Sequence, residues 1–266
     1  MRPATEHSTK SFLRTTCALL TAVALLSTSL GCGGPATQTG PSTLTVTSND
    51  QGSAAYQVVS FTTEDGLALS GRLYGTGGSA VLLCHMYPAD QTSWSPEAGK
   101  LAEQGYLVLT FDFRGYGKSQ GSKQIQYLDR DVTAAVQYLR AAGAQEIVLV
   151  GASMGGTACL KAAAQLQTLS SIRLAGVATF SAPVEFKGLS AREAVPSLVV
   201  PLMFVAAEGD VGAAGARELQ SLADNGGNLQ ILPGSDHGTD LFKGSQAASA
   251  EQLLLDFLRQ TLTGAL

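Results

Sequence analysis

The 266-residue sequence has few charges and few aromatic side chains: 14% of its residues are Asp, Glu, Lys or Arg, and 6% are Phe, Trp or Tyr. Its net charge is −4, and its basic residues form no cluster. Nucleic acid and anionic membranes need a positive surface, so we expect neither as an electrostatic partner. No His, Cys, Asp or Glu set has the spacing of a metal site, and no G-x-x-x-x-G-K-[ST] loop is present. We therefore expect no metal or organic cofactor.

Residues 1–31 predict an export signal. Three basic residues precede the uncharged apolar run CALLTAVALLSTSL, which ends just before Gly31 and Cys32. A basic start, a short apolar core and a small residue before the break are typical of a secretory signal, with a membrane-anchoring helix as the alternative. The stretch SLGC resembles a bacterial lipoprotein cleavage site, in which Cys32 would become the lipidated N-terminus. Ser29 stands where that family usually has Leu, and SLG also fits an ordinary signal peptidase.

Cysteine and histidine are scarce, with four and three copies. Removal of the signal takes Cys17 and His7 with it, and lipidation would consume Cys32. Cys84 and Cys159 then remain, and two cysteines make no disulfide framework. Either they bridge in an oxidising compartment, or they are two buried free thiols within apolar segments.

The rest of the chain divides into two parts. Residues 32–53 are mostly Gly, Pro, Ser, Thr, Asn and Gln, which predicts a flexible tether. Residues 54–266 predict one folded domain, long enough to bury a sizeable core.

Strand and helix patterns alternate from residue 54 onward. Strands are predicted at 55–63, 67–75, 80–85, 106–113, 146–150, 174–182, 201–208 and 228–233. Helices are predicted at 95–104, 127–143, 155–167, 213–225 and 249–262, the first with Ser95 as its cap. The middle strands are continuous apolar runs, typical of strands covered on both faces. We predict an α/β fold with about eight strands, mostly parallel, an antiparallel N-terminal hairpin and helices on both faces.

The stretch GASMGG places Ser153 between an apolar strand and a helix. G-x-S-x-G in this context is a nucleophile elbow, a sharp turn that exposes the hydroxyl and leaves room only for small residues at Gly151 and Gly155. The alternative is a glycine-rich turn with an incidental serine. Ligands bind where parallel strands end, so the residues after each strand are the candidates for partners.

A serine hydroxyl needs a base, and only two histidines remain after export. His85 ends a strand before Ser153, and we expect it to support the following loop. His237 follows the last strand and is the predicted base. For the acid that orients it we predict Asp210, with Glu208 as the runner-up; Asp236 adjoins the histidine and should point elsewhere.

An oxyanion hole needs two backbone N–H groups. We assign one to Met154, after the nucleophile, and one to Tyr87 in the loop HMYPADQTSW, with Met86 as the alternate. Trp94 in that loop is better explained by packing.

These residues resemble the α/β-hydrolase family over 54–266. The resemblance is carried by CHMYP, FDFRGYGKS, GASMGG, AAEGD and SDHG in that order, with HM where many members have HG. The short form is similar to dienelactone-hydrolase-like enzymes and small bacterial esterases. Asp112, Arg114 and Ser119 of FDFRGYGKS would then be structural. Residues 181–199 leave room for one short helix and no lid domain, which disfavours a lipase.

The sequence predicts an exported serine hydrolase that cleaves a carboxylic ester or thioester of a small molecule, with no nucleic-acid partner and with membrane contact only through a lipid anchor. Two alternatives stay open: an exopeptidase or amidase on the same Ser153, Asp210 and His237, and a non-catalytic exported binding protein. The oligomeric state is not predicted.

Overall fold

The computed structural model describes residues 45–47 and 54–263, all within one compact unit. The predicted export signal, Cys32 and most of the predicted tether lie outside the described residues. No helix in the described part is long and apolar enough to cross a membrane.

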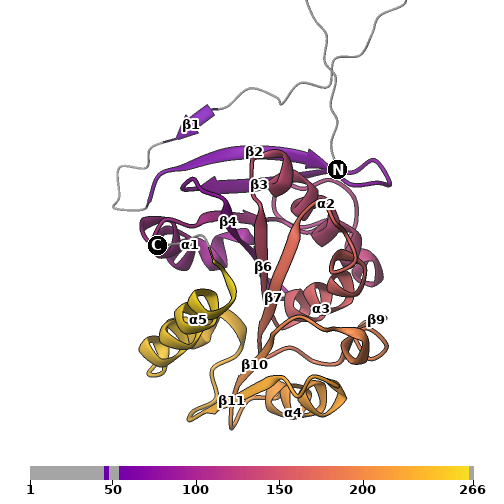
Figure 1. Ribbon diagram of the computed structural model, residues 1–266, viewed down its shortest axis with the longest axis vertical. Helices are drawn as coiled ribbons and strands as arrows, with labels where there is room; N and C mark the ends of the chain where they lie inside the picture. The colour runs from indigo at the N-terminus through magenta and orange to yellow at the C-terminus, as the bar shows by residue number, and fades with distance from the viewer. Residues whose placement is uncertain (1–44, 48–53, 264–266) are drawn as a thin grey trace, which may run out of the picture. The chain divides into compact units, whose positions relative to one another are not determined.

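A nine-stranded sheet forms the centre of the described residues, in the order β1-β2-β3-β5-β4-β6-β7-β10-β11 (Figure 1). Its strands are β1 (Thr45–Thr47), β2 (Tyr56–Thr62), β3 (Ala68–Tyr74), β4 (Ser79–Cys84), β5 (Leu107–Phe111), β6 (Glu146–Ala152), β7 (Arg173–Phe180), β10 (Leu202–Ala207) and β11 (Asn228–Leu232).

The strand directions confirm the predicted α/β class. β2 and β3 form the antiparallel hairpin, and β3 pairs antiparallel with β5. All neighbours from β5 to β11 are parallel. The register pairs Cys84 with Gly151 and Ala152 with Phe180, so β4, β6 and β7 end at a common edge. The residues that follow these strands therefore emerge side by side.

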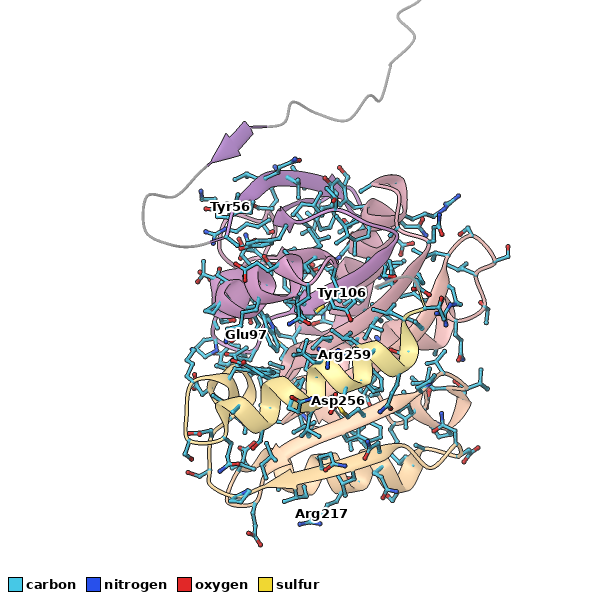
Figure 2. The ribbon with its side chains drawn as sticks, turned by 60° about the vertical axis from the view of Figure 1, so that its left-hand side comes forward. Tyr56, Glu97, Tyr106, Arg217, Asp256 and Arg259 are labelled. Carbon is cyan, nitrogen blue, oxygen red and sulfur yellow. The ribbon has the colours of Figure 1, made fainter. Side chains whose placement is uncertain are left out.

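Helices cover both faces of the sheet, as the continuous apolar strands predict (Figure 1). One buried cluster joins the sheet to α2 (Leu128–Ala141), α3 (Met154–Leu166) and α4 (Gly212–Leu222). The other joins it to α1 (Ser95–Glu103) and α5 (Ala247–Thr261). Short 3-10 turns are η1 (Gln91–Trp94), η2 (Ile125–Tyr127), η3 (Val195–Ser197) and η4 (Gly238–Phe242). Figure 2 shows α5 lying across one face of the sheet, with Asp256 and Arg259 labelled on it. These two residues form an exposed ion pair.

Two local expectations differ from the structure. Residues 45–47, within the predicted tether, pair with β2 and add a ninth strand at the edge of the sheet. Ser95 is not the helix cap: the turn η1 runs directly into α1, so Trp94 holds the cap position without a side-chain bond. The Ser95 hydroxyl instead accepts a hydrogen bond from Arg72 at 3.2 Å.

The segment between β7 and β10 contains a small hairpin. β8 (Glu185–Phe186) pairs antiparallel with β9 (Leu189–Ser190), and η3 follows. No lid domain is present among the described residues of this segment.

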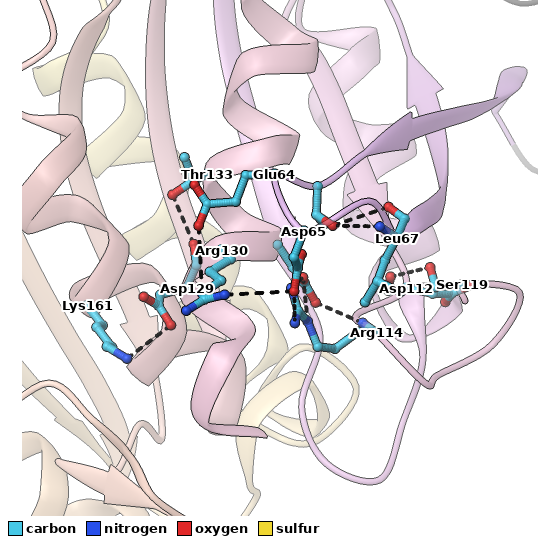
Figure 3. A network of polar contacts seen from close by, with 12 residues as sticks. Glu64, Asp65, Leu67, Asp112, Arg114, Ser119, Asp129, Arg130, Thr133 and Lys161 are labelled. Carbon is cyan, nitrogen blue, oxygen red and sulfur yellow. Dashed lines mark hydrogen bonds and ion pairs between the residues drawn. The ribbon is translucent and has the colours of Figure 1, made fainter. Parts of the chain in front are cut away.

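A buried arginine ties the β2–β3 turn to α2 (Figure 3). The Arg114 side chain is fully buried and forms ion pairs with Asp131 at 2.6 Å and Asp65 at 2.8 Å. Asp112 accepts bonds from Gln91 and the Lys118 backbone, and Ser119 donates to the Asp112 carbonyl. These three residues of FDFRGYGKS therefore have structural partners.

Candidate functional site

Ser153 sits at the junction of β6 and α3, in a backbone conformation that serine rarely adopts. Its φ is +47° and its ψ is −118°. Only 7% of the residue is exposed. A side chain normally avoids this region at a cost of about 1–3 kcal/mol, so the surrounding structure holds the turn in place.

The glycines on either side of Ser153 make this turn sterically possible. A Cβ on Gly151 would lie 2.4 Å from the carbonyl oxygen of Gly155. A Cβ on Gly155 would lie 2.4 Å from the Cys84 carbonyl oxygen and 2.6 Å from that of His85. The turn at Ser153 thus packs directly against the end of β4, where the loop with Tyr87 begins.

Asp210 and His237 come together from the loops after β10 and β11. The His237 Nδ1 lies 2.8 Å from the Asp210 Oδ1. The Asp210 side chain is 2% exposed and the His237 side chain 33% exposed. Because a carboxylate oxygen accepts the hydrogen bond, this contact assigns the imidazole proton to Nδ1 and leaves the lone pair on Nε2.

The second oxygen of Asp210 is buried and has no hydrogen-bond partner among the described residues. A buried carboxylate without full hydrogen bonding favours a positive charge beside it.

The loop that carries His237 packs against the turn that carries Ser153. A Cβ on Gly238 would lie 3.4 Å from the Cβ of Ala152. The end of β7 contacts both: the Phe180 carbonyl accepts from the Ser153 backbone at 2.8 Å, and the Ser181 hydroxyl accepts from the Gly238 backbone at 3.0 Å.

The Ser153 hydroxyl makes no hydrogen bond to the His237 ring in the described structure. The structure brings the predicted acid and base together and places the serine turn beside them, but it leaves this third contact open. In enzymes without substrate such contacts are often long and tighten in the complex.

The loop after β4 is held by His85, which is buried and has both ring nitrogens occupied. The Phe113 backbone N–H donates to Nε2 at 3.1 Å, so Nδ1 carries the proton and donates to the Met86 carbonyl at 2.9 Å. Burial lowers the pKa of His85 and keeps its ring neutral. His85 therefore has no nitrogen available as a base.

The Met86 carbonyl faces His85, so the Tyr87 N–H of the same trans peptide points the opposite way. This N–H has no hydrogen-bond partner among the described residues. Met154 is the first residue of α3, where backbone N–H groups lack partners within the helix. Both groups assigned to the oxyanion hole are thus available as donors.

Neither of the other two carboxylates considered as the acid is bonded to the His237 ring in the part of the chain that the structure describes. Glu208 is exposed, and Asp236 is half-buried and approaches Gly244. Trp94 is fully buried; its indole N–H donates to the Cys84 carbonyl, and its ring packs on Phe242. Cys84 and Cys159 are buried and unbridged.

Sequence reasoning missed Ser181. It is fully buried, has a φ of +58° and fixes the residue after His237. Its position directly after β7 was the available signal, since side chains after parallel strands share one edge.

No group of three or more His, Cys, Asp or Glu in the part of the chain that the structure describes could hold a metal ion. A hollow of about 520 Å³ lies between the β2–β3 turn and α2, lined in part by Glu64, Asp129 and Arg130. It contains none of the candidate residues.

A sequence model described as the alpha/beta hydrolase fold matches residues 79–196, less than half of the chain. Among curated proteins, the pig bifunctional epoxide hydrolase 2 is 35% identical over 81 residues, which are 30% of this chain and 15% of that enzyme. An uncharacterized protein of Mycobacterium tuberculosis is 26% identical over 223 residues, which are 76% of this chain and 77% of that protein. The first relatives match over well under two thirds of their length, 15% for the pig enzyme and 54% for an uncharacterized protein of Salmonella typhi.

Solved structures match over most of the chain. An esterase of Pyrococcus furiosus has a TM-score of 0.67 at 21% identity, covering 78% of this chain and 93% of that one. An esterase of Exiguobacterium antarcticum has a TM-score of 0.63 at 16% identity, covering 75% and 98%. Together with the sheet order and helix placement, these matches show that the chain has the α/β-hydrolase fold.

Proposed function

We propose that the protein is a serine hydrolase of the α/β-hydrolase family that cleaves a carboxylic ester or thioester. The observation that carries the proposal is the strained turn at Ser153 beside the bonded pair of Asp210 and His237. A nucleophile, a base and an acid that orients the base are the parts that acyl transfer through a serine requires.

In the proposed reaction, the Ser153 hydroxyl attacks the substrate carbonyl carbon while His237 Nε2 takes the hydroxyl proton. Asp210 holds the imidazole through Nδ1 and stabilises the imidazolium. The ring then gives its proton to the leaving group, and an acyl-serine remains. Water, deprotonated by the same nitrogen, releases the acid and restores the serine.

The negative oxygen that forms on the carbonyl carbon would accept from the Met154 and Tyr87 backbone N–H groups. Each such donor contributes about 3 kcal/mol to transition-state stabilisation. The support for this assignment is the close packing of the Ser153 turn on the end of β4, which places the two segments next to each other.

Some relatives are epoxide hydrolases, including the pig enzyme and one from Mycobacterium tuberculosis. A serine that opens an epoxide would form an ether, and water cannot release an ether by attacking an acyl carbon. A carboxylate nucleophile would form a releasable ester instead. Serine at position 153 therefore favours an acyl substrate for this chain.

The test is the turnover of Ser153→Ala on 4-nitrophenyl butanoate. We expect a loss of about 10⁴-fold or more with an unchanged circular dichroism spectrum. Near-normal hydrolysis by this variant would overturn the mechanism. Comparing the same ester with aminoacyl anilides separates an esterase from an exopeptidase or amidase, and a folded wild-type protein inactive on both would favour a binding protein.

We also propose export and lipid attachment at Cys32, supported by the basic start, the apolar run and the SLGC stretch. The intact mass of the protein from a membrane fraction tests this. A diacylglyceryl mass on a chain that starts at Cys32 is expected, and a chain without lipid that starts at Cys32 would contradict lipidation.

A further inference from the structure

Two lysines are held over tyrosine rings close to the candidate site. The Lys187 Nζ lies 4.1 Å from the centroid of the Tyr87 ring, and Phe186 packs on the same ring at 5.6 Å. The Lys123 Nζ lies 4.4 Å from the centroid of the Tyr116 ring. A ring face attracts an ammonium group, which favours a position of each charge over its tyrosine ring.

Both tyrosines belong to the surroundings of the proposed oxyanion hole. Tyr87 is assigned one of its N–H groups, and 40% of this residue is exposed. The Tyr116 hydroxyl contacts the sulfur of Met154 at 3.6 Å, and its ring packs on His85 with centroids 5.0 Å apart. Burial, together with the neighbouring Tyr87, raises the pKa of Tyr116 to about 12. Each lysine therefore lies over the ring of a tyrosine that belongs to this region.

Neither lysine forms an ion pair with another described residue. Lys100, Lys161 and Lys243 behave differently, since each pairs with a carboxylate. The two unpaired charges are also exposed, in a chain with a net charge of −4. An ammonium group without a carboxylate partner keeps its full attraction for an incoming anion.

We propose that the substrate is an ester that carries a carboxylate, and that Lys187 and Lys123 bind this carboxylate while the scissile carbonyl faces Met154 and Tyr87. The inference rests on the proposed hydrolase function and adds a substrate class to it. The lysines act on specificity: they select an anionic ester over a neutral one and take no part in the proton transfers.

The experiment uses the full chain and two pairs of esters matched in shape. In the first pair the two esters differ on the acyl side: 4-nitrophenyl hemiadipate carries a carboxylate there, and the matching amide is neutral. In the second pair they differ on the leaving group: 4-butanoyloxybenzoate is anionic, and 4-butanoyloxybenzamide is neutral. We measure kcat/KM for wild type, Lys187→Gln, Lys123→Gln and the double variant. Lys100→Gln is the matched control, because it removes the same charge from α1.

Wild type should favour the anionic member of at least one pair by about tenfold in kcat/KM. Each single variant should reduce that preference through a higher KM for the anionic ester, and the double variant should abolish it. High salt should weaken the preference in wild type. The Lys100→Gln variant should behave like wild type.

Equal kcat/KM for both members of both pairs would overturn the inference while leaving the hydrolase function intact. A preference for the anionic ester that survives in the double variant would also overturn it. The lysines would then only pack on the tyrosine rings and would not bind the substrate. Failure of folded wild type to hydrolyse any of the esters would instead contradict the proposed function itself.

Discussion

At the scale of single residues, the bond between Asp210 and His237 is the contact on which the proposed chemistry depends most. Asp210→Asn keeps the shape of the side chain but loses the charge that stabilises the imidazolium, and its amide can hold the ring in the wrong tautomer. We expect kcat to fall by about 10³- to 10⁴-fold, with the fold preserved. Steady-state kinetics on a 4-nitrophenyl ester measures this.

Glu208 provides the control, because it is the other carboxylate that follows β10 and it is exposed. Glu208→Gln should leave kcat within about twofold of wild type, in line with the small effects of most exposed substitutions. The opposite result, a large loss for Glu208→Gln and a small one for Asp210→Asn, would reassign the acid.

Residue types and chain order select the residues of the candidate site. Because histidine is scarce, only two residues are candidates for the base. Both ring nitrogens of His85 form hydrogen bonds, whereas His237 pairs with Asp210. The Ser181 bond to Gly238 could not be predicted in the same way, since it depends on where two distant loops meet.

At the scale of elements, the turn between β6 and α3 depends on a close approach of backbones. A side chain on Gly155 would collide with the carbonyl groups of Cys84 and His85, which are fixed at the end of β4. We expect Gly155→Ala to cost about 3 kcal/mol of unfolding free energy and to reduce activity strongly. Urea unfolding and ester kinetics measure the two effects.

Gly78→Ala is the matched control, because its added Cβ would meet only the Gln145 side chain at 3.6 Å. Its unfolding free energy should stay within about 1 kcal/mol of wild type. Equal stability of the two variants would show that the turn and the end of β4 are not packed as described.

Among the described residues, eight of the nine strands of the main sheet and the five α-helices follow from apolar periodicity, but three details do not. β1 lies in a polar segment, and only pairing with β2 makes it a strand. Serine is a residue type that caps helices, but η1 continues directly into α1 at Ser95. The Ser95 hydroxyl accepts a hydrogen bond from Arg72 instead. The β8–β9 hairpin is two residues per strand, too short for any periodicity to predict.

At the scale of the whole molecule, the buried Arg114 couples stability to pH (Figure 3). Its guanidinium lowers the pKa of the Asp65 carboxyl to about 2 from its ordinary value of 3.8. Because the folded pKa is below the unfolded one, the stabilisation is present above about pH 4 and is lost as the pH falls toward 2. Asp65→Asn should therefore cost about 1–2 kcal/mol at pH 7, after allowance for partial solvent screening.

Urea unfolding of wild type and Asp65→Asn between pH 7 and pH 3 tests this coupling. The difference in unfolding free energy between the two proteins should become smaller as the pH falls below 4. Asp256→Asn is the control, because it removes a carboxylate from an exposed ion pair on α5 (Figure 2). Its unfolding free energy should differ only slightly from that of wild type at every pH. A gap for Asp65→Asn that stays constant with pH would contradict the coupling.

The most direct test of the proposed chemistry is covalent labelling of the folded protein with a fluorophosphonate, followed by peptide mass spectrometry. A nucleophile activated by a neighbouring base should gain one phosphonyl group on the Ser153 peptide. Labelling should be absent in Ser153→Ala and strongly slowed in His237→Ala. A folded wild-type protein that stays unlabelled, or that is labelled on another serine, would contradict the assignment of Ser153 as the nucleophile.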